Sequence, residues 1–106
     1  MRKTISITAD IATELNILAE NPSIKNNSNA IKKTIFFQEI QNSEDIRIIL
    51  GNYLTFNAII LAIRLLAQSN SLLTLDLSAN NLGEHGPAVA EALAQSNLLQ
   101  ELYLTI

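Results

Sequence analysis

Cysteine is absent from this 106-residue chain, and charged residues make up only 16% of it. The lack of cysteine excludes disulfides and thiolate metal sites. It also favours an intracellular setting, where we expect the cytoplasm, although secretion by a non-classical route stays open. Because 48% of the residues are apolar, a disordered chain is not expected. The length supports one small domain with a single core.

Long hydrophobic runs and an excess of positive charge are also missing. The longest apolar run, "AIILAIRLLA" at 58–67, is interrupted by Arg64 and reaches half of the roughly 20 residues that a membrane-spanning helix needs. The N-terminus has no apolar stretch like that of a signal peptide. Residues 44–106 carry two basic and six acidic side chains, a balance that repels a phosphate backbone. We therefore expect a soluble protein that binds neither membranes nor nucleic acids.

A repeat of 27 residues is present in the second half of the chain. When residues 66–77 are aligned with residues 93–104, eight of twelve positions are identical. The identical pairs include Leu72 with Leu99, Leu75 with Leu102 and Leu77 with Leu104. Self-similarity at a period in the twenties is typical of a solenoid.

The best-defined repeat reads as a strand, a sharp turn and a helix. Leu75 and Leu77 alternate as on one face of a short strand, which Leu72 enters from the preceding loop. The amide of Asn80 is expected to bond backbone groups that the turn leaves unpaired, and Leu82 then returns to the core.

A helix is expected over residues 87–95, after the glycines of the turn. Val89, Ala90 and Leu93 are predicted to form its core face. The positions predicted to face solvent are Ala88, Glu91 and Ala92. Because one such unit cannot bury its apolar side alone, the leucines are expected to form a column shared by stacked units.

The pattern LxxLxLxxNxLGxxG at residues 72–86, followed by an alanine-rich helix, resembles the leucine-rich repeat. The alternation of strand and helix at this period is similar to the ribonuclease-inhibitor type. The resemblance is strong over 71–104 and degenerate over 46–70. It implies an α/β fold: a short solenoid with a parallel sheet on its concave side and an N-terminal helical cap.

Two parts of the chain are therefore expected: a helical cap region over 1–43 and repeats over 44–106, one degenerate, one full and one truncated. A shift of 27 places Ile48 on Leu75 and Tyr53 on Asn80, so residues 43–54 are either a strand or a helix. Within the cap region we predict helices near 10–20 and 30–41 and a loop at 21–29. The segment "TISIT" is a short strand or a frayed end.

The helix expected over 58–67 is apolar almost all round, which is typical of a helix covered on both sides. We expect the N-terminal helices to cover Ile60, Leu61 and Leu65. The alternative is that this patch binds a partner chain.

Strand residues between the core leucines are expected to point to the concave side, where the family resemblance implies that a protein partner binds. The candidates are Arg47, Ile49, Thr74, Asp76, Ser78, Glu101, Tyr103 and Thr105. Tyr103 is the expected anchor, because tyrosine buries a large area at low entropic cost. The competing interpretation of each residue is plain solvated strand surface. The residues predicted to be structural are Leu72, Leu75, Leu77, Asn80, Leu82, Leu93, Leu99, Leu102 and Leu104.

Reaction chemistry is not indicated. His85 is the only histidine, so a metal site lacks ligands, and no motif supports a catalytic set of Ser78, His85 and Asp76. We predict no enzyme and no cofactor, but a non-catalytic protein–protein interaction module, with self-association through the C-terminal edge strand as a further possibility. The alternative is a truncated N-terminal fragment of a larger leucine-rich-repeat protein without a function of its own.

Overall fold

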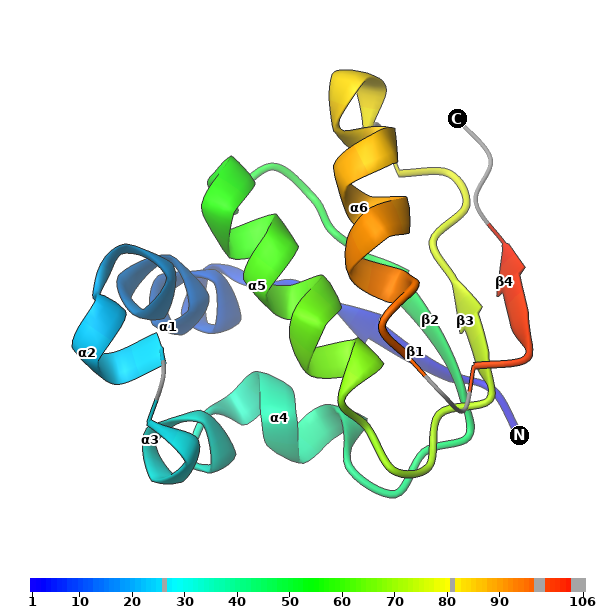
Figure 1. Ribbon diagram of the computed structural model, residues 1–106, viewed down its shortest axis with the longest axis horizontal. Helices are drawn as coiled ribbons and strands as arrows, with labels where there is room; N and C mark the ends of the chain where they lie inside the picture. Colours follow the sequence, from blue (N-terminus) through cyan, green and yellow to red (C-terminus); the bar gives the residue numbers. More distant parts are fainter. Residues whose placement is uncertain (26, 81, 97–98, 104–106) are drawn as a thin grey trace.

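Four parallel strands form the sheet around which the chain is built. The computed structural model describes residues 1–25, 27–80, 82–96 and 99–103. The strands are β1 (Lys3–Ser6), β2 (Asp45–Ile49), β3 (Thr74–Asp76) and β4 (Glu101–Tyr103), and they lie side by side in chain order. Each connection between neighbouring strands contains helix, because parallel strands require a crossover. Figure 1 shows these helices on one side of the sheet. The fold is therefore mixed α/β, as predicted.

The helices begin where the sequence supplies a cap. The segment between β1 and β2 holds α1 (Ala9–Glu20), α2 (Pro22–Lys25), α3 (Ser28–Lys32) and α4 (Ile35–Ile40). The later crossovers hold α5 (Phe56–Ala67), then the 3-10 turn η1 (Gly83–His85) with α6 (Gly86–Leu93). In α1, α4 and α5 the residue before the first turn is a threonine: Thr8, Thr34 and Thr55. Each threonine hydroxyl accepts a hydrogen bond from the backbone N–H three residues later, which satisfies a donor that the helix leaves free.

The N-terminal region differs from the predicted helical cap in three respects. Residues 3–6 form β1 and pair with β2, so the region adds a strand to the sheet as well as helices. The expected loop at 21–29 contains the short helix α2 and the start of α3. The single helix expected near 30–41 is divided into α3 and α4, because Thr34 ends one helix and caps the next.

The register between β2 and β3 corrects the alignment of the degenerate repeat. Ile46 lies opposite Leu75 and Arg47 opposite Asp76, an offset of 29 residues where 27 was expected. The slip is two residues, which equals the side-chain period of a strand, so every side chain keeps its predicted face. Arg47 and Ile49 therefore still lie on the same face as Asp76 and Ser78. The open choice at 43–54 resolves to a strand, β2.

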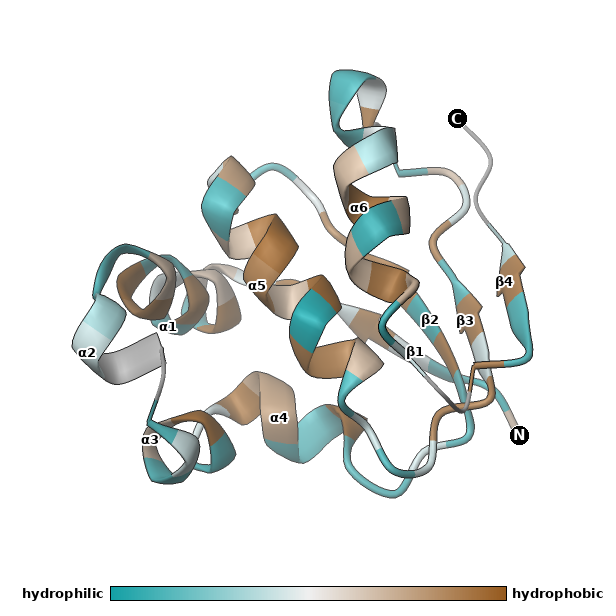
Figure 2. Ribbon diagram, in the orientation of Figure 1, coloured by the Kyte–Doolittle hydropathy of each residue, from teal (hydrophilic) through white to brown (hydrophobic). Residues whose placement is uncertain are grey.

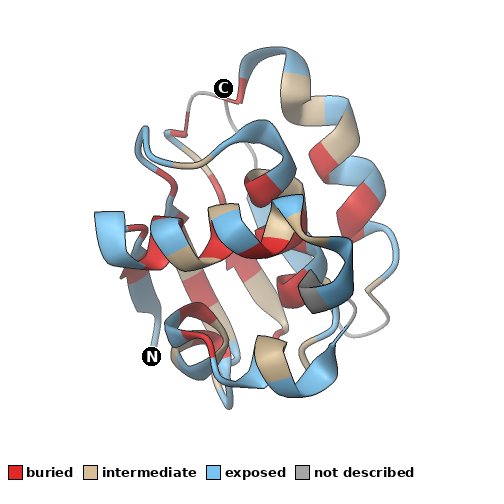
Figure 3. Ribbon diagram, turned by 90° about the vertical axis from the view of Figure 1, so that its left-hand side faces the viewer, coloured by how far each residue is buried: buried red, intermediate tan, exposed pale blue. Residues whose placement is uncertain are grey.

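The hydrophobic core lies between the sheet and the helices. Ile46, Ile48, Leu75 and Leu77 point into it and are fully buried, and Figure 3 shows buried positions recurring along strands and helices. Of the predicted structural leucines, Leu72, Leu82 and Leu93 are also buried, and Leu99 is partly buried against the same core. Leu104 and Thr105 lie outside the described residues.

Two predicted core positions are wrong. Leu102 is 39% exposed, because β4 is the outermost strand and no described helix follows to cover it. In α6, Ala90 is exposed and Ala92 is buried beside Val89 and Leu93, the reverse of the predicted assignment. The reason is helical geometry: residues three and four positions after Val89 share its side, whereas the next residue is rotated by about 100°.

Helix α5 is covered by its neighbours, as its composition predicts. It packs between α1 and α6 and touches α4, and Figure 2 shows it largely hydrophobic. Leu61 and Leu65 are buried, whereas Ile60 stays half-buried. Asn16 of α1 further ties the two helices together: its Oδ1 accepts the N–H of Thr55 at 2.9 Å, immediately before α5. Within the described residues, no helix combines the length and apolar character needed to cross a membrane.

Candidate functional site: the open face of the sheet

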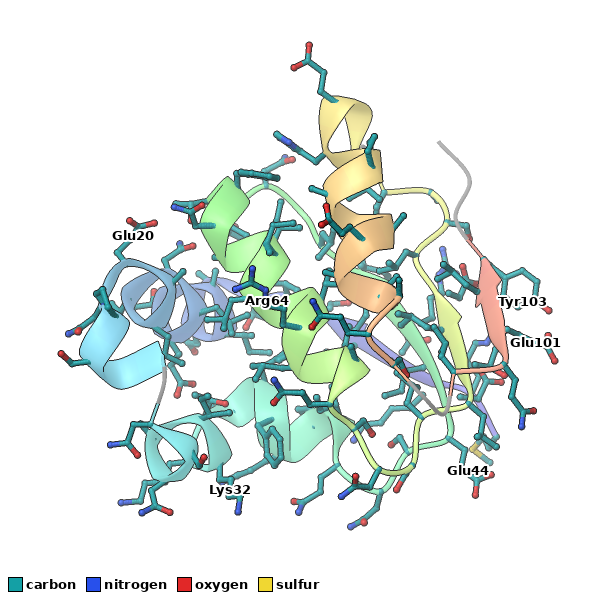
Figure 4. The ribbon with its side chains drawn as sticks, in the orientation of Figure 1. Glu20, Lys32, Glu44, Arg64, Glu101 and Tyr103 are labelled. Carbon is teal, nitrogen blue, oxygen red and sulfur yellow. The ribbon has the colours of Figure 1, made fainter. Side chains whose placement is uncertain are left out.

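The sheet face turned away from the helices carries the predicted partner-binding residues. We call it the open face. Its residues are Arg2, Thr4 and Ser6 from β1 and the residue before it, Asp45, Arg47 and Ile49 from β2, Thr74, Asp76 and Ser78 from β3 and its end, and Glu101 and Tyr103 from β4. They alternate along the strands with the buried Ile5, Ile46, Ile48, Leu75 and Leu77. In Figure 4 Glu101 and Tyr103 extend from β4 away from α5 and α6.

Cross-strand register brings residues from distant parts of the chain into rows. Thr4, Arg47, Asp76 and Tyr103 occupy successive strands at one level of the sheet, and Asp45, Thr74 and Glu101 lie at the level beside it. With about 4.8 Å between neighbouring strands, a row across four strands spans roughly 14 Å. This is a shallow surface suited to a peptide segment or a protein, with Ile49 and Tyr103 exposed by 40% and 46% as its apolar contacts.

Asp76 is not the free surface residue that the sequence predicts. It is only 7% exposed, because its carboxylate is held by three donors. Oδ1 accepts the backbone N–H of Ser78 at 2.9 Å and also the hydroxyl of Ser78, and Oδ2 accepts Nη1 of Arg2 at 2.8 Å. These bonds with Ser78, and secondarily the positive charge of Arg2, hold the pKa of Asp76 below its ordinary value.

Arg2 is the residue that sequence reasoning missed. Its Nε donates to Asp45 Oδ1 at 3.0 Å, its Nη1 donates to Asp76, and its Cζ lies 5.8 Å from the ring centroid of Tyr103. The hydrogen bond to Asp45 is the main cause of the raised pKa of Arg2. Alternation through "RKTIS" would have placed Arg2 on the face of Thr4 and Ser6, had that segment been identified as a strand.

Two further side chains complete the electrostatics of the open face. The hydroxyl of Tyr103 donates to Glu101 Oε2 at 2.6 Å, and this bond to a carboxylate raises the pKa of Tyr103. Arg47 lies between Thr4 and Asp76, and its Nε is buried without a hydrogen-bond partner in the described part of the chain. The carboxylates of the open face are therefore oriented mainly by Arg2, Ser78 and Tyr103.

Asn80 fixes the turn that follows β3, as predicted. Its Nδ2 donates to the carbonyl oxygens of Ile48 and Leu77 at 2.7 and 3.0 Å, and its Oδ1 accepts the N–H of Leu50 at 2.8 Å. Two of these three bonds reach the preceding strand–turn segment. Asn80 therefore joins successive coils and sets the level at which Asp76 and Ser78 meet β2.

A cleft between α5 and α6 is the main competing site. It has a volume of about 420 Å³ and is lined by Ala19, Phe56, Asn57, Ile60, Leu61, Arg64, Ala88, Glu91, Ala92 and Gln95. His85 stacks on Phe56 at the α5 side, with ring centroids 4.2 Å apart. The small side chains of Ala88 and Ala92 leave the space open, and Figure 4 shows Arg64 on the helix side of the molecule.

Catalytic and metal chemistry finds no support in these contacts. His85 lies against Phe56, while Asp76 and Ser78 bond each other on the open face, so these three residues make no connected set. The described residues contain no group of three or more His, Cys, Asp or Glu side chains placed to hold a metal ion.

No protein-family model, curated protein or solved structure matches this chain.

Proposed function

We propose that this chain is a short leucine-rich-repeat solenoid that binds a protein partner, without catalysis, through the open face of its sheet. The observation that carries the proposal is the contrast between the two faces. One face is buried under helices, while the other presents Ile49 and Tyr103 among oriented charged groups. Exposed aromatic and apolar residues beside fixed charges are typical of interface hot spots.

The repeat assignment rests on a supporting set of contacts. Ile46 and Ile48 lie level with Leu75 and Leu77 in adjacent parallel strands, which gives the column expected of stacked coils. Asn80 bonds both its own coil and the coil before it. The N-terminal region caps this column on the β1 side, where Ile5 lies level with Ile48.

A selection experiment tests the binding proposal. A randomised peptide library displayed on phage is panned against the wild-type protein, and the enriched peptides are measured by biolayer interferometry against variants. Ile49→Arg and Tyr103→Ala are expected to weaken most of these peptides at least tenfold, because each removes a central apolar contact. Ile17→Arg is the matched control, since Ile17 is exposed on α1 and lies outside the open face.

A cleft variant makes the test two-sided. Ala88→Arg fills the cleft between α5 and α6 without touching the open face. Peptides that bind Ile49→Arg and Tyr103→Ala as tightly as wild type, but lose affinity for Ala88→Arg, would show that the cleft is the binding site and refute the proposal.

Self-association through β4 is a second contact that we propose. All three residues of β4 are exposed, and its outer edge is unpaired in the described residues. An exposed edge strand is a ready template for another strand. Sedimentation velocity at increasing concentration is expected to show dimers that Leu102→Lys removes. A monomer at all concentrations would contradict this contact.

A further inference from the structure

A guanidinium already occupies the middle of the open face. Arg2 reaches it from the segment before β1, and three elements of the sheet contribute contacts: Asp45 on β2, Asp76 on β3 and the ring of Tyr103 on β4. We call these three side chains the arginine cradle. Two carboxylates and an aromatic face are the groups that recognise a planar cation best, because they combine charge-assisted hydrogen bonds with a cation–π contact.

The arginine cradle is oriented by bonds that do not involve Arg2. Asp76 is held by the N–H and hydroxyl of Ser78, which leave its Oδ2 directed to the cation. The hydroxyl of Tyr103 is tied to Glu101. Groups that are fixed before binding lose little freedom when a ligand arrives, so the cradle keeps much of its recognition geometry if Arg2 leaves.

Arg2 itself is held weakly enough to be exchanged. Its side chain is 39% exposed, it precedes the first paired residue of β1, and Met1 beside it is fully exposed. Ion pairs of such exposure contribute little to stability, because water and salt screen them. Displacement of Arg2 by another cation of the same shape therefore costs little.

We propose that the arginine cradle recognises an arginine side chain of the protein partner and that Arg2 fills the cradle until the partner displaces it. This inference rests on the proposed function and names the partner chemistry at that site. Once Arg2 is displaced, the open face holds three carboxylates, those of Asp45, Asp76 and Glu101, against the single cation of Arg47. That balance attracts a basic segment.

Arginine is favoured over lysine by the observed contacts. Arg2 uses two different nitrogens, Nε and Nη1, to reach carboxylates on two strands. An ammonium group presents a single nitrogen and no planar face, so it cannot reproduce both bonds and the aromatic contact in the same way.

NMR titration with a small blocked amino acid tests the inference. The probe is Nα-acetyl-L-arginine N-methylamide, added to the ¹⁵N-labelled Arg2→Gln variant, in which the native occupant is removed. Shift changes are expected to centre on Asp45, Asp76 and Tyr103. Binding to wild type is expected to be weaker, by up to about fivefold, since the probe must compete with exposed ion pairs. Arg64→Gln, an arginine substitution on α5, is the matched control and should bind the probe like wild type.

Two further probes and one further variant identify the chemistry. The lysine analogue should bind Arg2→Gln more weakly than the arginine probe, and the citrulline analogue, which has the same shape without charge, should cause no shift changes at the cradle. Asp45→Asn introduced into Arg2→Gln should weaken the arginine probe. Equal responses to arginine and citrulline, or no localised shifts in Arg2→Gln, would overturn the inference.

The inference and the proposed function fail separately. If panned peptides depend on Ile49 and Tyr103 but contain no enriched arginine, the open face binds a partner and the arginine cradle is refuted. If the arginine probe binds the cradle while panned peptides bind the cleft, the cradle stands as a cation site and the proposed function is refuted.

Discussion

Replacement of Asn80 by alanine is predicted to lower the free energy of unfolding by about 3 kcal/mol. The side chain of Asn80 is 7% exposed and makes three hydrogen bonds to the backbone, with Ile48, Leu77 and Leu50. Each buried backbone group that loses its partner costs at least about 1 kcal/mol. Since small domains are stable by only about 5–15 kcal/mol, this loss is a large share of the total.

Urea denaturation followed by circular dichroism measures this loss. With a slope of about 1.5 kcal/mol per molar urea, the midpoint should fall by about 2 M. Asn70→Ala is the matched control, because Asn70 is exposed and makes no side-chain hydrogen bond in the described residues; its midpoint should stay near that of wild type. An Asn80→Ala midpoint equal to that of Asn70→Ala would refute the reasoning.

A second substitution separates hydrogen bonding from simple loss of side-chain volume. Asn80→Asp keeps the volume and the acceptor for the N–H of Leu50, but its second oxygen meets the carbonyl oxygens of Ile48 and Leu77. Ionised aspartate should therefore be strongly destabilising, and protonation at low pH should recover part of the loss, since the protonated oxygen can donate one bond. Equal stability of wild type and Asn80→Asp at neutral pH would show that these donor bonds carry little.

Three further predictions concern the backbone, the open face and the core. Gly51 has φ +66°, so Gly51→Ala should destabilise by about 1 kcal/mol, whereas Gly86→Ala, in helical conformation with nothing within 4 Å of the added Cβ, should be neutral or stabilising in thermal melts. The lowered pKa of Asp76 means that its contribution is present above the ordinary carboxyl value of 3.8 and is lost as the pH falls through the depressed value. Wild type should therefore lose more stability than Asp76→Asn between about pH 5 and pH 2, and parallel curves would contradict this. Leu65→Ala should cost about 3 kcal/mol in chemical denaturation because Leu65 is buried under the neighbouring helices, and Ile17→Ala, at an exposed position of α1, should change stability by less than about 0.5 kcal/mol; similar effects of the two would argue against the packing of α5.

The second half of the fold follows from the sequence because its signals are local. Alternation at Leu75 and Leu77 predicts the strand, and Asn80 predicts the fixed turn after it. The offset of 29 residues to β2 was missed since Ile46, Ile48 and Leu50 alternate as well, and periodicity alone does not say which pair meets Leu75. The relative positions of two strands depend on pairing across the sheet.

The open face was predictable only in part for the same reason. Alternation placed Thr74, Ser78, Glu101 and Tyr103 correctly, but the burial of Asp76 depends on Arg2, which is 74 residues away in the chain. Ion pairs across a sheet leave no local pattern. The exposure of Leu102 likewise depends on its place at the edge of the sheet, which the repeat does not encode.

Mapping a selected peptide onto the protein by amide shift changes is the most direct test of the central claim, that the open face of the sheet binds the partner. A peptide from the library selection is titrated into ¹⁵N-labelled wild-type protein, and perturbed amides are located on the structure. We predict that they cluster on β1–β4, with Ile49, Asp76 and Tyr103 among the most shifted. Changes confined to the facing sides of α5 and α6, with the strands unaffected, would contradict the account.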